Sequence, residues 1–124
     1  VIINAYELTS SGAFKTIKQD SGTTIINATI ISSPSDIPVS ITGGSLTINN
    51  ARIVAMGANK NAVEKTGGTL ILNNSTLIAT GTGKSIFASS PQSVKIYGRC
   101  QANLAVDANI TQQVGTLTID PNVI

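Results

Sequence analysis

Histidine is absent from the 124-residue sequence, and cysteine occurs once, at Cys100. Without histidine the chain can form neither a Ser–His or Cys–His catalytic pair nor a zinc site with a histidine ligand. A single cysteine also excludes a disulfide within the chain. The sequence therefore excludes histidine-dependent nucleophilic catalysis and zinc sites with a histidine ligand.

Charged and aromatic side chains are scarce as well. Charged residues make up 11% of the chain, the net charge is +2, tryptophan is missing, and there are two tyrosines and two phenylalanines. Such a weak, scattered positive charge argues against a nucleic-acid surface. No apolar run approaches the roughly 20 residues that a membrane-spanning helix needs. We expect no nucleic-acid partner and no membrane insertion.

What the sequence does have is a repeat. The segment TGGSLTINNARI at 42–53 returns 24 residues later as TGGTLILNNSTL at 66–77. Related five-residue stretches, VIINA, TIINA, LTINN, LILNN, VKIYG and LTIDP, begin at Val1, Thr24, Leu46, Leu70, Val94 and Leu117. Their starting residues are 22 to 24 positions apart. The chain is thus interpreted as six copies of one unit, the last of them incomplete.

Each copy alternates apolar and polar positions, as in Leu46-x-Ile48 and Leu70-x-Leu72, which is the pattern of a strand with one buried face. A second short strand, a Gly-rich turn and a third short stretch follow. Three residues after each starting residue stands a polar corner residue, with Tyr97 in the fifth copy and, in the others, Asn4, Asn27, Asn49, Asn73 and Asp120. Asparagine tolerates left-handed backbone and can hydrogen-bond to an equivalent side chain in the next copy. We predict a structural ladder of these five side chains.

A 22–24-residue coil with three short strands predicts an all-β fold, a right-handed parallel β-helix of about six rungs, with residues 1–124 as one solenoid domain. A leucine-rich repeat has an overlapping period, but it would require regular leucine spacing and a helical outer segment. Since the chain opens on Val1 without a signal-peptide pattern, we expect a processed product or a fragment of a longer chain.

The segments GGSLTINNARI and GGTLILNNSTL resemble the right-handed parallel β-helix superfamily, which includes pectate-lyase-like enzymes and bacteriophage tailspikes. Residues 93–120 also look like the C-terminal coils of phage tail-fibre or spike proteins. This resemblance implies a structural or adhesive module of a virion appendage that supports or displays a receptor-binding surface. It further implies a homotrimer located on the virion surface or outside the cell.

Catalysis receives little support from the residues. Polysaccharide-cleaving β-helices cluster acidic side chains on one outward face, whereas the six acids of this chain fall at different positions of the coil. We name no catalytic residue, no metal ligand and no cofactor, and we favour a protein that is not an enzyme. The alternative is a polysaccharide-binding or polysaccharide-cleaving β-helix whose site forms between subunits.

Hydroxyl side chains precede five of the six starting residues, at Thr23, Ser45, Thr69, Ser93 and Thr116. A flat lattice-binding surface, such as one for ice, would need two such columns side by side. Because only one column is complete, we interpret it as a ladder along the strand edge.

The best small cluster for contact with a bacterial surface glycan is Lys95, Tyr97 and Arg99, where an aromatic ring stands between two cations. The segment 11–22, SGAFKTIKQDSG, departs most from the polarity of the repeat. We expect a protruding loop there, without chemistry of its own.

Overall fold

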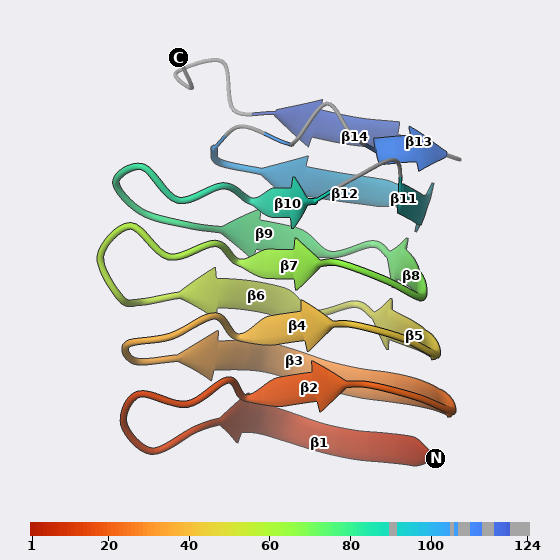
Figure 1. Ribbon diagram of the computed structural model, residues 1–124, viewed down its shortest axis with the longest axis horizontal. Coiled ribbons are helices and arrows are strands. Elements are labelled where there is room, and N and C mark those ends of the chain that lie inside the picture. The colour runs from red at the N-terminus through yellow and green to blue at the C-terminus, as the bar shows by residue number, and fades with distance from the viewer. Residues whose placement is uncertain (90–91, 105, 107–109, 113–115, 120–124) are drawn as a thin grey trace.

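The computed structural model describes residues 1–89, 92–104, 106, 110–112 and 116–119. Its strands run parallel and stack coil upon coil as a β-solenoid of about four turns, which confirms the predicted all-β fold. Figure 1 shows the coils winding in a right-handed sense from the N-terminus upward. The described residues include no helix long and apolar enough to cross a membrane.

The described strands are short, apart from two that continue around a corner of the coil. In chain order they are β1 (Ile2–Thr9), β2 (Ile17–Gln19), β3 (Thr23–Ser33), β4 (Val39–Ile41), β5 (Ser45–Asn49), β6 (Arg52–Ala55), β7 (Val63–Lys65), β8 (Thr69–Asn73), β9 (Thr76–Ile78), β10 (Ile86–Ala88), β11 (Gln92–Tyr97), β12 (Arg99–Ala102), β13 (Ile110–Gln112) and β14 (Thr116–Ile119).

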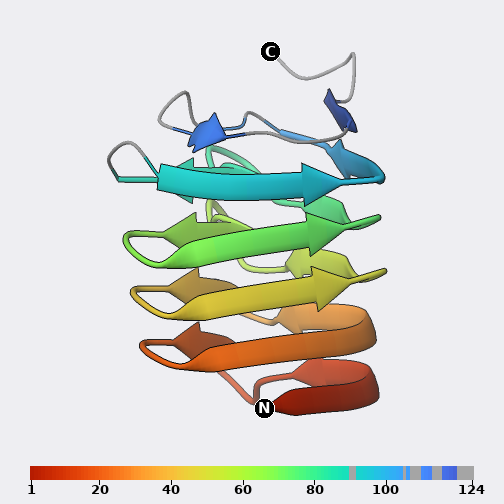
Figure 2. The same cartoon turned by 90° about the vertical axis from the view of Figure 1, so that its right-hand side faces the viewer.

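These strands form three faces. The first face contains the start of β3 with β5, β8 and β11, and the second contains the end of β3 with β6, β9 and β12. The third face is the four-stranded sheet β2-β4-β7-β10. Figure 1 shows the third face in front of the second, and Figure 2 shows the flat first face toward the viewer. Segments 10–16, 34–38, 56–62 and 79–85, which we call the loop edge, connect the second face to the third.

Aliphatic side chains fill the interior because alternate strand residues point inward at the same register in every coil. On the first face Ile26, Ile48 and Leu72 pair in successive strands, and all three are fully buried. Equivalent columns line the other two faces, with Ile31, Ile53 and Leu77 on the second face and Val39, Val63 and Ile86 on the third. At about 25 cal/mol per Å² of apolar surface, this burial is the main favourable contribution to folding.

Glycine is required at the corner between the third and first faces. Gly44 and Gly68 have φ angles of 72° and 71°, in the left-handed region that favours glycine. A Cβ on Gly44 would clash with the carbonyl oxygen of Gly22, one coil earlier. The repeated Gly-Gly therefore permits both the backbone conformation and the close stacking of successive corners.

The count of six rungs is wrong, since the structure has about four turns. The copy that begins at Leu117 adds no rung to the first face, because the last coil departs from the 22–24-residue period. Thr116 pairs with Arg99 after 17 residues, and Leu117 pairs with Cys100 on the second face, not with Val94 on the first. The edge of β11 is paired with β13 instead. Strands of the first and second faces both alternate apolar and polar residues. The alternation in the LTID segment therefore could not show to which of these two faces it belongs. Asp120, assigned to the ladder, lies outside the described residues.

The segment 11–22, expected to be one protruding loop, includes β2. Residues 10–16 belong to the loop edge, whereas Ile17, Lys18 and Gln19 pair with Val39, Ser40 and Ile41. The charged side chains of this segment, two lysines and one aspartate, obscure the alternation that places Ile17 and Gln19 inward.

Replacing Ile48 with aspartate should abolish folding, because a carboxylate would be buried between Ile26 and Leu72 without a partner. Thr47→Asp is the matched control, since Thr47 is the neighbouring outward position of β5 and is only half-buried. Circular dichroism melting of both variants tests this expectation. A soluble Ile48→Asp protein with a cooperative transition would contradict the assignment of the interior.

Candidate functional site

An asparagine ladder runs along the corner between the first and second faces. Nδ2 of Asn27 donates to Oδ1 of Asn4 at 2.8 Å, Asn49 donates to Asn27 at 2.8 Å, and Asn73 donates to Asn49 at 2.6 Å. All three bonds run in the same direction along the solenoid. Tyr97 occupies the next position, beside Asn73.

The corner after the ladder is fixed by residues with positive φ angles. Asn50, Asn74 and Gly98 have φ values of 56°, 47° and 65°. Oδ1 of Asn74 accepts a hydrogen bond from the backbone N–H of Arg99 at 3.0 Å. These residues therefore turn the chain from the first face to the second after β5, β8 and β11, whereas β1 and β3 continue around the same corner as unbroken strands.

The outward side of the first face is almost free of charge. Over three successive strands its residues are hydroxyl, isoleucine and asparagine side chains only, namely Thr23, Ile25, Asn27, Ser45, Thr47, Asn49, Thr69, Ile71 and Asn73. The predicted hydroxyl column is present in register at Thr23, Ser45 and Thr69. Beside it, Ile25, Thr47 and Ile71 form a half-buried central column. Such a flat, uncharged surface is suited to packing against another flat surface.

The predicted glycan cluster is divided by a corner. Lys95 and Tyr97 alternate on β11 and share its outward side, and Tyr97 is 39% exposed. Arg99 is exposed but begins β12, beyond the turn at Gly98. The structure brings Lys95 and Tyr97 to one face and puts Arg99 on the next, so all three residues can meet only a ligand that spans the corner.

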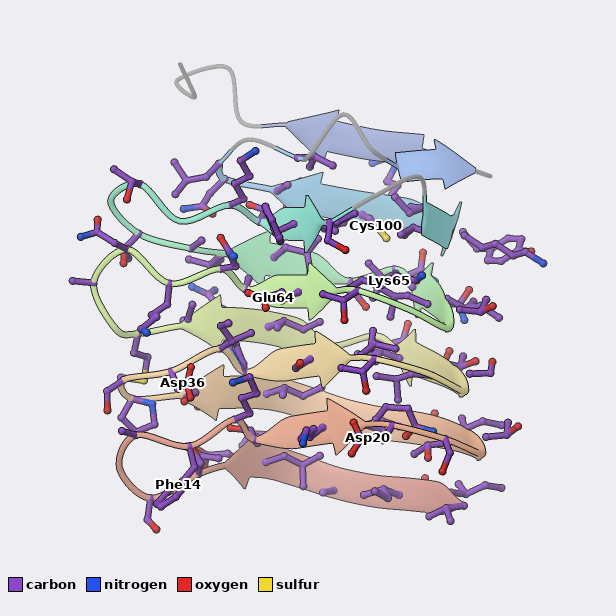
Figure 3. All side chains as sticks on the ribbon, in the orientation of Figure 1. Phe14, Asp20, Asp36, Glu64, Lys65 and Cys100 are labelled. Carbon is purple, nitrogen blue, oxygen red and sulfur yellow. The ribbon has the colours of Figure 1, made fainter. Side chains whose placement is uncertain are left out.

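The described acidic side chains are dispersed. Figure 3 shows Asp20 beside β2, Asp36 at the loop edge and Glu64 on β7. Thr42 donates a hydrogen bond to Oδ1 of Asp20 at 2.5 Å, and this bond, aided by nearby Lys18, lowers the pKa of the Asp20 carboxyl. Asp107 lies outside the described residues. In the described part of the chain, no three His, Cys, Asp or Glu side chains gather where they could hold a metal ion.

Lys65 is a buried lysine that the sequence analysis missed. Its side chain is 0% exposed, stacks between Ile41 and Ala88 on the third face, and its Nζ donates to the carbonyl oxygen of Gly68 at 2.5 Å. Burial lowers the pKa of the Lys65 ammonium. Its spacing was the available signal, since Val63-x-Lys65 has the same phase as Val39-x-Ile41.

Gln19 occupies the same inward column as Lys65 and likewise donates hydrogen bonds to carbonyl groups of the next corner. Its Nε2 donates to the carbonyl oxygens of Ser21 at 2.6 Å and Gly22 at 3.2 Å. In both cases a polar side chain reaches from the end of a third-face strand to the carbonyl groups of the following corner. Lys65 and Gln19 therefore have structural partners and do not line an open site.

Cys100 is fully buried, and burial raises the pKa of its thiol. The backbone N–H of Ser75 points to its sulfur at 3.5 Å. A buried thiol with a raised pKa has little thiolate, so Cys100 belongs to the packing of the interior.

Together the parallel faces, buried columns and asparagine ladder define a β-solenoid. Comparison of the chain with protein-family models, with curated proteins and with solved structures finds no match.

Asn49→Ala should lower the unfolding free energy by about 1–3 kcal/mol, because it removes two ladder hydrogen bonds at a half-buried corner. Asn4→Ala is the matched control, since it removes only the bond from Asn27 at the exposed end of the ladder. Urea unfolding of both variants measures the difference. An equal loss of stability in the two variants would contradict a stabilising role for the middle rungs of the ladder.

Lys65→Met should stabilise the protein at neutral pH and flatten its pH dependence. The folded-state pKa of Lys65 is lowered from its ordinary value of 10.5, so the unfolded chain binds the proton more tightly. The penalty is complete below the folded-state pKa and disappears as pH rises toward 10.5, so wild-type stability should increase across that window. Unfolding from neutral to alkaline pH measures the slope. Lys60→Met, at a turn on the loop edge, should retain the wild-type slope; the same slope in Lys65→Met would contradict this account.

Proposed function

We propose that the chain is a structural and adhesive β-solenoid module of a phage virion appendage, a tail fibre or spike. It supports or displays a receptor-binding surface on the virion or outside the cell, and it acts as a homotrimer. The similarity of its repeat to right-handed parallel β-helices and its repetitive construction favour such a role.

One observation carries this proposal, the uncharged outward side of β3, β5 and β8 on the first face. Nine outward positions on β3, β5 and β8 lack a charge. On the first face a charge enters only with Lys95 of the next strand, β11, whereas the other two faces carry Arg52 and Glu64 outward beside these nine positions. Burying charged groups between subunits is costly unless they are paired, so a charge-free sheet is the least costly to cover. Each coil also presents the same kinds of side chain at the same height, as a lengthwise contact between parallel columns requires.

The solution mass by light scattering tests this proposal. We expect three times the chain mass of 12.7 kDa, with no release of oligosaccharides from bacterial surface glycans. Thr47→Lys, which places a charge at the centre of the uncharged area between Ile25 and Ile71, should give a folded monomer. Thr76→Lys, a half-buried outward position on the second face, should leave the trimer intact. A wild-type monomer that cleaves glycans would contradict the proposal and favour a polysaccharide-cleaving solenoid.

A further inference from the structure

The loop edge presents an exposed aromatic side chain on a hydrogen-bonded backbone. Phe14 is 67% exposed, yet its carbonyl oxygen accepts two hydrogen bonds, from Oγ of Ser10 at 2.7 Å and from Oγ of Ser33 at 2.8 Å. Thr16, two residues later, donates to the carbonyl oxygen of Ser32 at 2.6 Å. The backbone is therefore anchored at Phe14 and Thr16, although the ring of Phe14 gains little from burial.

Ser33 brings three coils together at this place. This fully buried serine hydrogen-bonds to Phe14 of the first coil, and its carbonyl oxygen accepts from the N–H of Met56 in the third. Pro34, which follows Ser33, is exposed, and Met56 is 61% exposed. Phe14, Pro34 and Met56 thus form an exposed apolar strip across three neighbouring coils.

A carboxylate borders the strip. The backbone N–H of Asp36 donates to Oγ of Ser33 at 3.2 Å. Oδ1 of Asp36 accepts a hydrogen bond from the backbone N–H of Ile37. Its Oδ2 lies 3.7 Å from Nζ of Lys15, which is longer than a hydrogen bond and leaves acceptor capacity for a ligand hydroxyl. Figure 3 shows Phe14 and Asp36 on the same edge of the molecule.

We propose that Phe14, Pro34, Met56 and Asp36 form a saccharide-binding surface, which we call the Ser33 strip. The ring of Phe14 packs against the apolar C–H face of a sugar unit, and Oδ2 of Asp36 accepts one of its hydroxyl groups. Three exposed apolar side chains are too few for a stable protein interface, which buries about 800 Å² on each partner. An apolar platform bordered by a carboxylate and the exposed Ser35 hydroxyl suits a small ligand with one apolar face and many hydroxyls.

This inference rests on the proposed function, because it locates the receptor contact of the same module. Figure 1 shows the loop edge on the opposite side from β5 and β8 of the first face. A trimer that buries the first face would leave the Ser33 strip accessible. The strip is also separate from Lys95 and Tyr97, the contacts expected from the sequence.

The single methionine of the chain supplies a specific probe. In a sample labelled with ¹³C at the methionine methyl, Met56 gives one resonance, to be followed during titration with neutral oligosaccharides of glucose, galactose, mannose and N-acetylglucosamine. We expect a saturable shift with at least one of them. Phe14→Ala should weaken that binding about tenfold, the loss expected for one aromatic contact, without changing the melting temperature. Asp36→Asn should also weaken binding.

Tyr6→Ala and Tyr97→Ala are the matched controls, because both remove exposed aromatic rings outside the strip. Binding that persists in Phe14→Ala but is lost in Tyr97→Ala would overturn the inference and leave the appendage proposal standing. So would a trimer that binds none of the oligosaccharides. A Met56 shift that depends on protein concentration alone would identify a contact between copies of the chain and would also overturn it.

Discussion

Parallel hydrogen bonding between equivalent strands of successive coils is the constraint on which the rest of the structure depends. It fixes neighbouring strands about 4.8 Å apart and brings the same position of each coil to the same place in cross-section. Inward positions must then be apolar in coil after coil, as Ile26, Ile48 and Leu72 are. Corners must also repeat, which explains why asparagine and glycine recur where the backbone turns.

The same constraint divides the surface into two kinds. Residues on the faces repeat because their strands are in register, and over β3, β5 and β8 of the first face this produces a flat, uncharged surface. The loop edge lies outside the paired strands, so its segments can differ in length and composition without disturbing the columns. A ligand-binding residue can therefore occur on the loop edge in one coil alone. Phe14, exposed on a hydrogen-bonded backbone, is such a departure from the repeat.

The sequence was sufficient to predict what repeats and insufficient where the repeat is interrupted. The alignment of Leu46, Leu70 and Val94 and the asparagine column follow from spacing alone, and the structure has both. The pairing of Leu117 with Cys100 did not follow, because a coil shortened to 17 residues breaks the count. The burial of Lys65 was not predicted, because a lysine is expected at the surface even where the strand alternation puts it at an inward position. The Ser33 strip depends on side-chain hydrogen bonds between coils, which no spacing encodes.

The whole structure requires that residues 22 to 24 positions apart pack directly against each other inside the solenoid. Nuclear Overhauser contacts between selectively labelled isoleucine and leucine methyl groups measure this most directly. The structure predicts strong cross-peaks from Ile48 to both Ile26 and Leu72, its register partners in adjacent strands. Cross-peaks from Ile48 to Ile71, which points outward, with none to Leu72 would contradict the register and with it the account of the interior and the surface.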